Sequence, residues 1–258
     1  MRTPLLLMAT VLLTAVACAN SQESTEAPHE HADAQGDEAP AAEGQGHGHG
    51  QGGQEASVNE HGYKGHHRFD DPEKWTAHFE SEERTAWQKP DEVVASLGLA
   101  ADARVADLGA GTGYFSVRFA AAAPQGQVFA VDIEPAMVEW LGKRAERDGL
   151  SNLVAIQGEA NAPALPEAVD VAFMCNVFHH LGDPKAYFEA VAGKLAPEGK
   201  VVIVDFRADN PEDAPGPPAK MRMTAEQITE IMTDAGYTLV SEDDELLEYQ
   251  YMLTFTRG

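Results

Sequence analysis

The stretch VADLGAGTGYF (Val105–Phe115) joins an apolar strand pattern to three closely spaced glycines. Those glycines are Gly109, Gly111 and Gly113. Residues 104–108 predict a strand, and the alanine-rich run 114–123 predicts a helix. Glycines between a strand and a helix let the backbone turn tightly and approach a ligand closely. The stretch therefore predicts a strand–loop–helix unit with a ligand at its loop.

Strands and helices alternate from this unit onward. Further strands are predicted at 127–133, 152–157, 169–175 and 200–206, helices at 135–149, 184–195 and 224–235, and a closing strand pair at 237–241 and 249–256. This alternation is typical of right-handed βαβ units. We expect an α/β, Rossmann-like, doubly wound fold with a mainly parallel seven-stranded sheet and a C-terminal antiparallel strand pair. In such sheets, ligands bind at the carboxyl ends of the strands.

Two carboxylates narrow the choice of ligand. The loop has the spacing G-x-G-x-G, one residue shorter than the G-x-G-x-x-G pattern of dinucleotide-binding folds. Asp107 lies two positions before the first glycine, and Asp132 ends the second strand 25 residues later, where an acid can accept hydrogen bonds from ribose hydroxyls. A nicotinamide oxidoreductase is an alternative, but the loop spacing and the lack of an obvious hydride-transfer site disfavour it.

Three motifs in order carry a family resemblance. VADLGAGTGYF is followed by AVDIEP at 130–135 and by QGEANAPALP at 157–166. This set, over about residues 103–206, resembles the class I S-adenosylmethionine-dependent methyltransferases, in particular the small ones that act on small molecules. The resemblance implies S-adenosylmethionine as cofactor and direct in-line transfer of its methyl group to a small-molecule acceptor.

The resemblance also implies roles for individual residues. Asp107 would support the loop and the methionine amino end, and the three glycines would let the backbone pass close to the cofactor. Asp132 would bind the ribose hydroxyls, and Ile133 would lie against the adenine. Glu159 stands where many relatives have Asp, near the adenine amino group. Asn176, after the fourth strand, would lie near the transferred methyl.

An acceptor that must lose a proton needs a nearby base. His179 and His180, in NVFHHLGDP after the fourth strand, are the candidate catalytic residues. The alternative interpretation is that this histidine pair orders the loop or caps the following helix.

The N-terminus has the pattern of a lipoprotein-type signal at residues 1–18. Arg2 precedes an apolar run that ends in Ala15-Val16-Ala17-Cys18. Lipidated Cys18 would anchor the chain to a membrane in the cell envelope, outside the cytoplasmic membrane; an ordinary signal with a chance cysteine is the alternative. Residues 19–60 are rich in His, Gly and Glu and predict a disordered tether.

Residues 61–98 predict an N-terminal helical cap before a methyltransferase domain at 99–258. The segment HHRFDDPEKW…F…ERTAWQKPDEV resembles the N-terminal segment of exported bacterial methyltransferase-like proteins. It would fold over the cofactor pocket and bring in His66, His67, His78 and Trp87, although simple helical packing is the alternative for the tryptophans. Those histidines together with His179 could instead bind a metal, but no spacing is a zinc or iron signature, and no metal site is predicted.

The composition excludes some partners. With 42 acidic and 18 basic residues, the net charge of −24 repels nucleic acid. The N/D-P-P-Y motif of amino-methylating enzymes is absent, since Asn176-Val177-Phe178-His179 stands in its place. The acceptor is therefore expected to be a small molecule.

The predicted location in the cell envelope conflicts with the predicted cofactor, because S-adenosylmethionine is made inside cells. One hypothesis is a true methyltransferase. The other is a non-catalytic envelope lipoprotein that keeps the fold and binds a small molecule or a metal. The first is favoured, because Asp107, Asp132 and all three glycines are present.

Overall fold

The structure is a computed structural model that describes Phe69 and residues 71–258. Its strands are β1 (Arg104–Leu108), β2 (Gln127–Asp132), β3 (Leu153–Gln157), β4 (Val169–Cys175), β5 (Leu195–Phe206), β6 (Tyr237–Asp243) and β7 (Gln250–Arg257). Its helices are α1 (Pro72–Phe79), α2 (Glu82–Gln88), α3 (Pro90–Ser96), α4 (Ser116–Ala122), α5 (Pro135–Asp148), α6 (Pro184–Ala192) and α7 (Ala225–Asp234), with 3₁₀ turns η1 (Phe178–His180) and η2 (Ala219–Met221).

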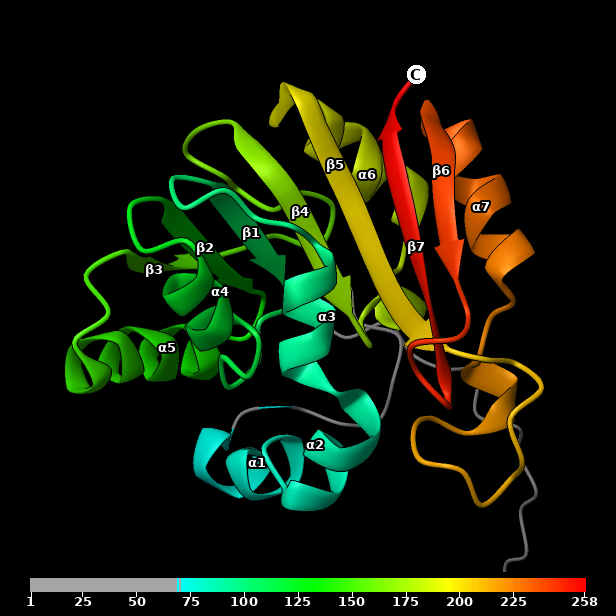
Figure 1. Ribbon diagram of the computed structural model, residues 1–258, viewed down its shortest axis with the longest axis horizontal. Coiled ribbons are helices and arrows are strands. Elements are labelled where there is room, and N and C mark those ends of the chain that lie inside the picture. Colours follow the sequence, from blue (N-terminus) through cyan, green and yellow to red (C-terminus); the bar gives the residue numbers. More distant parts are fainter. Residues whose placement is uncertain (1–68, 70) are drawn as a thin grey trace, which may run out of the picture. The chain divides into compact units, whose positions relative to one another are not determined.

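The strands form one sheet in the order β3-β2-β1-β4-β5-β7-β6 (Figure 1). The first five strands of that order pair in parallel, and β7 pairs antiparallel with both β5 and β6. The predicted Rossmann-like fold with its C-terminal antiparallel pair is therefore confirmed. The chain winds outward from β1 in one direction and from β4 in the other, so a crevice is expected at the carboxyl ends of these two neighbours.

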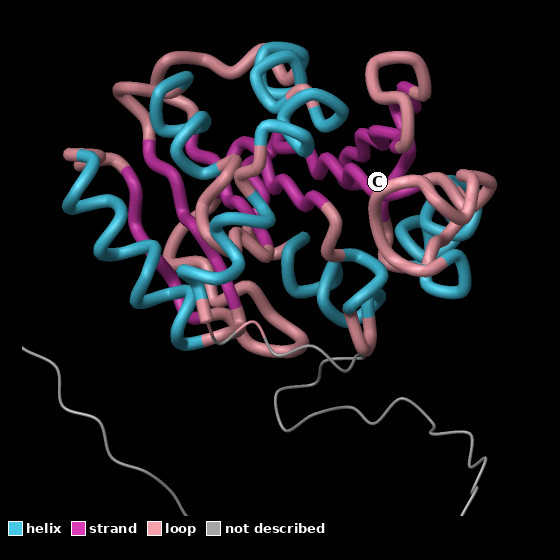
Figure 2. Tube along the Cα trace, turned by 90° about the horizontal axis from the view of Figure 1, so that it is seen from below, coloured by secondary structure: helices cyan, strands magenta, loops and turns pink. Residues whose placement is uncertain are grey.

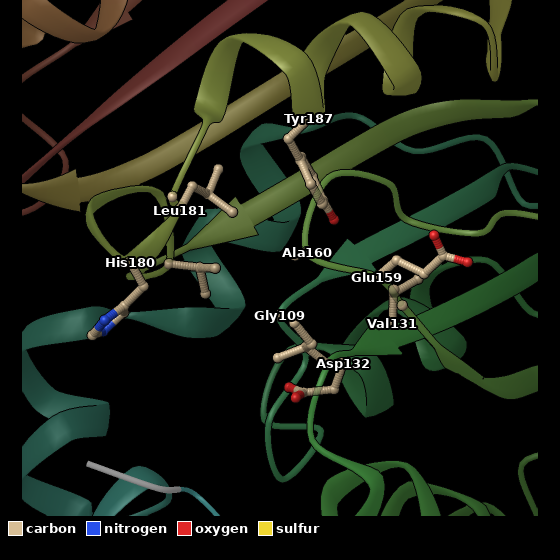
Figure 3. Close-up of a pocket in the computed structure, with 12 residues that line it drawn as sticks. Gly109, Val131, Asp132, Glu159, Ala160, His180, Leu181 and Tyr187 are labelled. Carbon is tan, nitrogen blue, oxygen red and sulfur yellow. The ribbon is translucent and has the colours of Figure 1, made fainter. Parts of the chain in front are cut away.

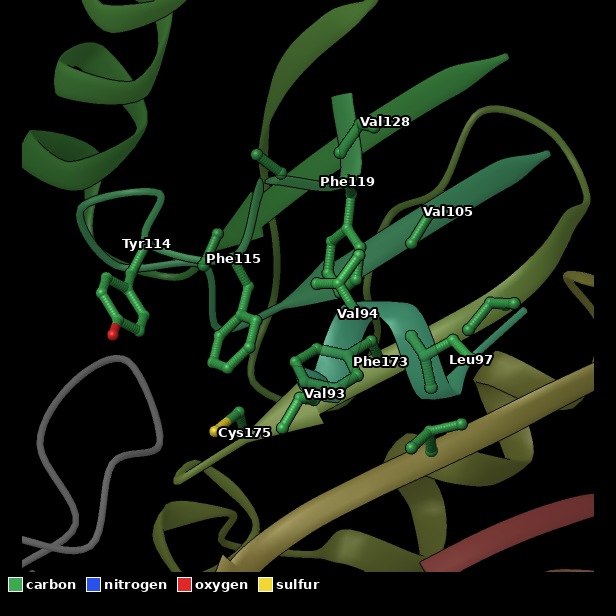
Figure 4. Close-up of a cluster of buried hydrophobic side chains, with 14 of the residues drawn as sticks. Val93, Val94, Leu97, Val105, Tyr114, Phe115, Phe119, Val128, Phe173 and Cys175 are labelled. Carbon is green, nitrogen blue, oxygen red and sulfur yellow. The ribbon is translucent and has the colours of Figure 1, made fainter. Parts of the chain in front are cut away.

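Helices cover both faces of the sheet. Side chains of α3, α4 and α5 pack in one apolar cluster, and those of α6 and α7 pack in a second cluster on the opposite face. Figure 4 shows the first cluster, in which Phe115 and Phe119 lie against Phe173 of β4. Their ring centroids lie 4.8 and 5.0 Å from that of Phe173. Figure 2, seen from below, shows the strands between the helices. This double layer fixes the strand ends that carry the site.

Local sequence explains where the helices begin. Proline stands in the first turn of α1, α3, α5 and α6, where its missing N–H costs nothing. The Asp183 side chain accepts a hydrogen bond from Ala186 N, and Thr224 forms a capping box with Gln227. These caps match the starts expected for the helices near 184 and 224.

Two segments differ in detail from the expectation. Within the predicted helical cap, Trp75 and Trp87 lie on separate helices, because Ser81 interrupts the helical run and caps α2 by accepting a hydrogen bond from Arg84 N at 3.1 Å. The fifth strand begins at Leu195, where the pairing with Val169 precedes a register shift. The sequence between that shift and Lys200 contains Pro and Gly, which conceal a strand from pattern analysis.

Several predictions lie outside the described residues. They are the signal at 1–18 with Cys18, the tether at 19–60, and the positions of His66 and His67. Across Phe69 and residues 71–258, no helix has the length and apolar character needed to cross a bilayer. The domain boundaries at 60/61 and 98/99 stay predictions.

Candidate active site

The glycine loop lies at the carboxyl end of β1 and has a left-handed backbone at each glycine, with φ of 77°, 55° and 92°. A Cβ at Gly109 would lie 2.5 Å from Val177, and one at Gly113 would lie 2.9 Å from Leu141. These two glycines are therefore required by the packing of the loop itself. At Gly111, a Cβ would meet the Phe79 ring of α1 at an ordinary 3.7 Å. Gly111 is thus the glycine that faces the helices before the sheet.

Asp132 ties this loop to the end of β2. Its buried carboxylate accepts hydrogen bonds from Gly111 N at 2.8 Å and Glu134 N at 2.9 Å. Burial raises the pKa of Asp132 to about 6, although the two backbone N–H groups oppose the shift. The acid that the sequence places at the second strand end therefore lies directly beside the glycine loop.

Asp107, in β1, is also buried. Its carboxylate accepts a 2.6 Å hydrogen bond from the Ser116 hydroxyl at the start of α4. Burial raises the pKa of Asp107 to about 7, and the charge of Asp132 adds to the increase. Two acids with raised pKa values at neighbouring strand ends are typical of a ligand site rather than of a structural ion pair.

A narrow slot opens on one side of Gly109 (Figure 3). Ile133, Leu181 and Tyr187 supply apolar walls. Figure 3 shows the Tyr187 hydroxyl directed toward Ala160 and Glu159. Glu159 is exposed at the edge of the slot, whereas Asp132 is buried within it. The slot therefore offers an apolar space with the carboxylates of Asp132 and Glu159 in its lining.

A larger cavity of about 580 Å³, here called the aromatic cavity, lies beneath the cap helices α1 and α2. Its lining is Phe69, Trp75, His78, Phe79, Ser81, Glu83, Arg84, Trp87, Asn176, His179, His180, Phe206, Pro215, Gly216, Pro217, Pro218 and Met221. Figure 1 shows α1 and α2 at the end of the sheet to which the parallel strands point. His78 and Trp87 thus line the aromatic cavity, whereas neither lines the slot or the small cavity at the glycine loop, so their predicted place at the cofactor stays a prediction.

His179 has a carboxylate partner in this cavity. Its Nδ1 lies 3.0 Å from both carboxylate oxygens of Asp205, near the end of β5, and both side chains are 4% exposed. Asp205 also accepts a hydrogen bond from Phe206 N at 2.8 Å. Because a carboxylate can only accept, Nδ1 donates and the other ring nitrogen is left as the basic one. The Asp205 contact thus fixes the tautomer and the ring orientation of His179.

His180 has a different place from its neighbour. It lines both the slot and the aromatic cavity, and its ring centroid lies 6.1 Å from that of Phe69. Its ring is directed away from Tyr187 in Figure 3. His180 therefore forms part of the wall between the two spaces.

Asn176 follows β4 with a left-handed φ of 61°. Its side chain donates to Gln88 Oε1 at 3.3 Å and accepts from Gln250 Nε2, and Gln88 donates in turn to Gln250. Both glutamines are fully buried. Asn176 lines the aromatic cavity and also joins α2 to β7, so its position has a structural reason besides the implied place near a transferred methyl.

The spaces adjoin at shared residues. Phe79 and Arg84 line the aromatic cavity and also a small cavity against Asp107 and Gly111. The small cavity and the aromatic cavity are therefore neighbours, with the side chains of Phe79 and Arg84 between them. No group of three or more potential metal ligands occurs within the part of the chain that the structure describes, and the metal hypothesis stays untested because His66 and His67 lie outside it.

Sequence reasoning missed four residues that shape this site: Arg84, Gln88, Asp205 and Gln250. Asp205 had a usable signal, since it is an acid near the end of an apolar strand, in the same position as Asp107 and Asp132. Gln88 and Gln250 have no such signal, because they are 162 residues apart, and Arg84 has none because it stands in a polar helix.

Comparisons with known proteins agree with this geometry. A family model described as a methyltransferase domain matches residues 99–255. A malonyl-[acyl-carrier protein] O-methyltransferase of Methylococcus capsulatus is 42% identical over 105 residues, which cover 40% of this chain and 38% of that protein. The enzyme of the same name from Hahella chejuensis is 26% identical over 98 residues, or 38% of this chain and 34% of that protein. The chain thus spans about a third of the length of these curated relatives.

Among solved structures, a SAM-dependent methyltransferase from Aquifex aeolicus superposes with a TM-score of 0.67 at 25% identity. The match covers 73% of this chain and 99% of that one. The family match covers more than half of the chain and contains the glycine loop, Asp132 and His179. The chain therefore belongs to the class I S-adenosylmethionine-dependent methyltransferases.

Proposed function

We propose that this protein transfers the methyl group of S-adenosylmethionine to a small-molecule acceptor held in the aromatic cavity. The observation that carries the proposal is the shared lining: Phe79 and Arg84 touch both the glycine-loop cavity and the aromatic cavity. Ligands in the two cavities would therefore be neighbours, and direct transfer depends on such proximity.

The residues at the strand ends fit the cofactor. The slot walls Ile133 and Tyr187 suit a flat adenine, and the buried Asp132 carboxylate suits ribose hydroxyls. Asp107, on the other side of Gly109, suits an ammonium group. When bound, S-adenosylmethionine supplies a methyl group that is already activated by the sulfonium.

His179 is assigned as the general base. Asp205 orients its ring and stabilises the imidazolium that forms when the other ring nitrogen accepts a proton. His180 is assigned to the wall between the cofactor slot and the cavity. The sequence alone gives no reason to prefer one of the two histidines as the base. The contact with Asp205 supports His179.

The acceptor is proposed to be apolar and planar, with a hydroxyl as nucleophile. Aromatic and proline side chains dominate the cavity, and its volume of about 580 Å³ lies within the range typical of small-molecule sites. A base with a carboxylate partner suits a nucleophile that must lose a proton. The similarity to two O-methyltransferases supports oxygen as the methylated atom.

The test is methyl transfer with an isotopically labelled cofactor and a panel of aromatic phenols, carboxylic acids, thiols and amines. We expect labelled product and S-adenosylhomocysteine with at least one oxygen acceptor, and loss of both in Asp132→Ala. Glu198→Ala, which removes an exposed carboxylate elsewhere on the sheet, is the matched control and should keep full activity. Equal background in wild type and Asp132→Ala across the whole panel would refute the proposal.

The proposed location is the cell envelope, with the chain held on a membrane by lipidated Cys18. Its support is the sequence of residues 1–18, which lie outside the described residues. A labelled fatty acid should be incorporated by the wild type and not by Cys18→Ser, which should also leave the membrane fraction. Membrane retention of unlabelled Cys18→Ser would contradict this location. If the location holds, the cofactor must be supplied outside the cytoplasm.

A further inference from the structure

The loop after β5 places a glycine directly on an aromatic ring of the acceptor cavity. Gly216 has a φ of 108°, and a Cβ at this position would lie 2.6, 2.6 and 2.7 Å from three atoms of the Phe206 ring. Because these distances are nearly equal, the Cβ would stand over the face of the ring rather than at its edge. Both residues line the aromatic cavity. Glycine is therefore required here by the close approach as well as by the backbone conformation.

The loop that carries Gly216, residues 207–218, is held in place by polar contacts. Buried Arg222 donates from Nε to Pro217 O at 2.8 Å and from a terminal nitrogen to Asn210 O at 3.0 Å. Asn210 Nδ2 donates in turn to Tyr249 O at 2.7 Å, just before β7. The loop also contains four prolines, each of which fixes its own φ. The loop therefore forms a fixed wall of the aromatic cavity.

The Phe206 ring has a second neighbour in Trp87 of the cap. The two ring centroids lie 5.6 Å apart, with an angle of 51° between the ring planes. Trp87 also lines the aromatic cavity, and Phe206 is buried. With the fixed loop behind one face, the ring can yield only toward Trp87 and the cavity. A side chain at position 216 would therefore narrow the space in which the acceptor is proposed to bind.

The same ring lies next to the residues assigned to proton transfer. Asp205, which directly precedes Phe206, holds Nδ1 of His179 at 3.0 Å. His179 and Phe206 both line the aromatic cavity. An acceptor whose hydroxyl reaches His179 would therefore have its ring system beside Phe206.

The aromatic cavity has room for more than one ring. An apolar cavity of about 150 Å³ is large enough to bind benzene, whereas the aromatic cavity has a volume of about 580 Å³. A single-ring acceptor would leave most of this space unfilled, and the lost contacts would weaken its binding. The volume and the aromatic lining together favour a larger flat acceptor.

We propose that the acceptor is a hydroxylated compound with two or more fused aromatic rings, and that Gly216 limits its size through the Phe206 ring. The inference rests on the proposed function and deepens it. Phe206 touches the acceptor, whereas Gly216 is a positioning residue that acts through Phe206. The absence of a side chain at position 216 thus becomes a determinant of specificity.

The test compares methyl transfer by the full chain to 2-naphthol and to phenol. In the wild type we expect kcat/KM for 2-naphthol to exceed that for phenol by at least about tenfold. Gly216→Ala should lower kcat/KM for 2-naphthol about 10- to 100-fold and that for phenol by no more than about threefold, because the displaced Phe206 ring takes the space of the second ring. Affinity for S-adenosylhomocysteine should stay within about twofold, which shows that the variant is folded.

Gly236→Ala is the matched control. Gly236 has a φ of 88° and no atom within 4 Å of its built Cβ, so the substitution strains the backbone without meeting a ring. It should change neither value of kcat/KM by more than about twofold. A double-mutant cycle with Phe206→Leu tests the route through the ring. In the Phe206→Leu background, Gly216→Ala should lower kcat/KM for 2-naphthol by less than about threefold, since the ring atoms that the Cβ meets are gone.

Equal losses for both acceptors in Gly216→Ala, or an unchanged loss in the Phe206→Leu background, would overturn the role of Gly216. A wild type that prefers phenol, or that methylates neither compound while using another acceptor of the panel, would overturn the fused-ring acceptor. Each of these results leaves the proposed function intact. Transfer by the wild type to no acceptor of the panel would overturn the proposed function and this inference with it.

Discussion

The site joins two regions that are built differently. The strand-end region, Asp107 with the glycine loop and Asp132, is held by contacts close in the sequence, such as Ser116 to Asp107 and Gly111 to Asp132. The cap, α1 and α2, is held by contacts that span up to 162 residues, from Gln88 to Gln250. The family match contains the first region and begins after the second. The cofactor chemistry is therefore a local property of the chain, whereas closure of the site is a property of the whole fold.

The two regions also differ in what they contribute to stability. The strand-end region buries two carboxyl groups with raised pKa values, which lowers the stability of the folded state at neutral pH. The cap adds buried hydrogen bonds and a partly buried ion pair. Changes at the strand ends should thus cost function more than stability, and changes in the cap contacts should do the reverse.

The largest expected effect is on catalysis at a strand end. His179→Ala should lower the rate of methyl transfer to an oxygen acceptor about 10²- to 10⁴-fold, because the general base is lost. Affinity for S-adenosylhomocysteine should stay within about twofold. His78→Ala, in the cap but lining the same cavity, should lose much less rate. Similar losses in the two variants would remove the distinction between the regions.

Asp107→Asn should stabilise the protein while weakening cofactor binding. The pKa of Asp107 is raised to about 7 in the folded protein. The protonated carboxyl group therefore contributes its full share to the free energy of unfolding below about pH 4, and this contribution is lost as the pH rises through 7. The variant should therefore match wild type near pH 4 and exceed it by about 2–4 kcal/mol at pH 8. Denaturant unfolding at both pH values measures this, and a destabilised variant at pH 8 would contradict it.

Gln88→Ala should show the opposite pattern. It leaves buried polar groups of Gln250 and Asn176 without their partner, at a cost of about 2–3 kcal/mol of unfolding free energy. Glu82→Ala, on an exposed position of the same helix, should stay within about 0.5 kcal/mol of wild type. If both variants unfold alike, the buried network is not what holds the cap.

Glu80→Gln should give the smallest change in stability. It should lower the free energy of unfolding by about 1–2 kcal/mol, since the ion pair with Arg144 is partly exposed. The same change should speed proteolysis within α1 before the sheet unfolds, because Glu80 also holds Thr112 of the glycine loop. Limited proteolysis at increasing salt checks this order. Equal protection of α1 in wild type and variant would contradict a role of the Glu80 contacts in holding α1 to the glycine loop.

Prediction from sequence succeeded where the contacts are local. The strand–loop–helix unit with Asp107 and Asp132 could be read from fewer than 30 consecutive residues, and the described strands confirm it. The sequence could not separate His179 from His180, because the Asp205 partner lies on another strand. Arg84 stands in the polar helix EERTAWQ, where nothing distinguishes it from a solvated residue.

The most direct test of the central claim is S-adenosylmethionine binding by calorimetry on the full chain, with Asp132→Ala alongside. We expect a dissociation constant in the micromolar range for wild type and an affinity at least about 30-fold lower in the folded variant, because the buried carboxylate for the ribose is gone. Absence of binding by well-folded wild-type protein, or equal binding by both proteins, would contradict it.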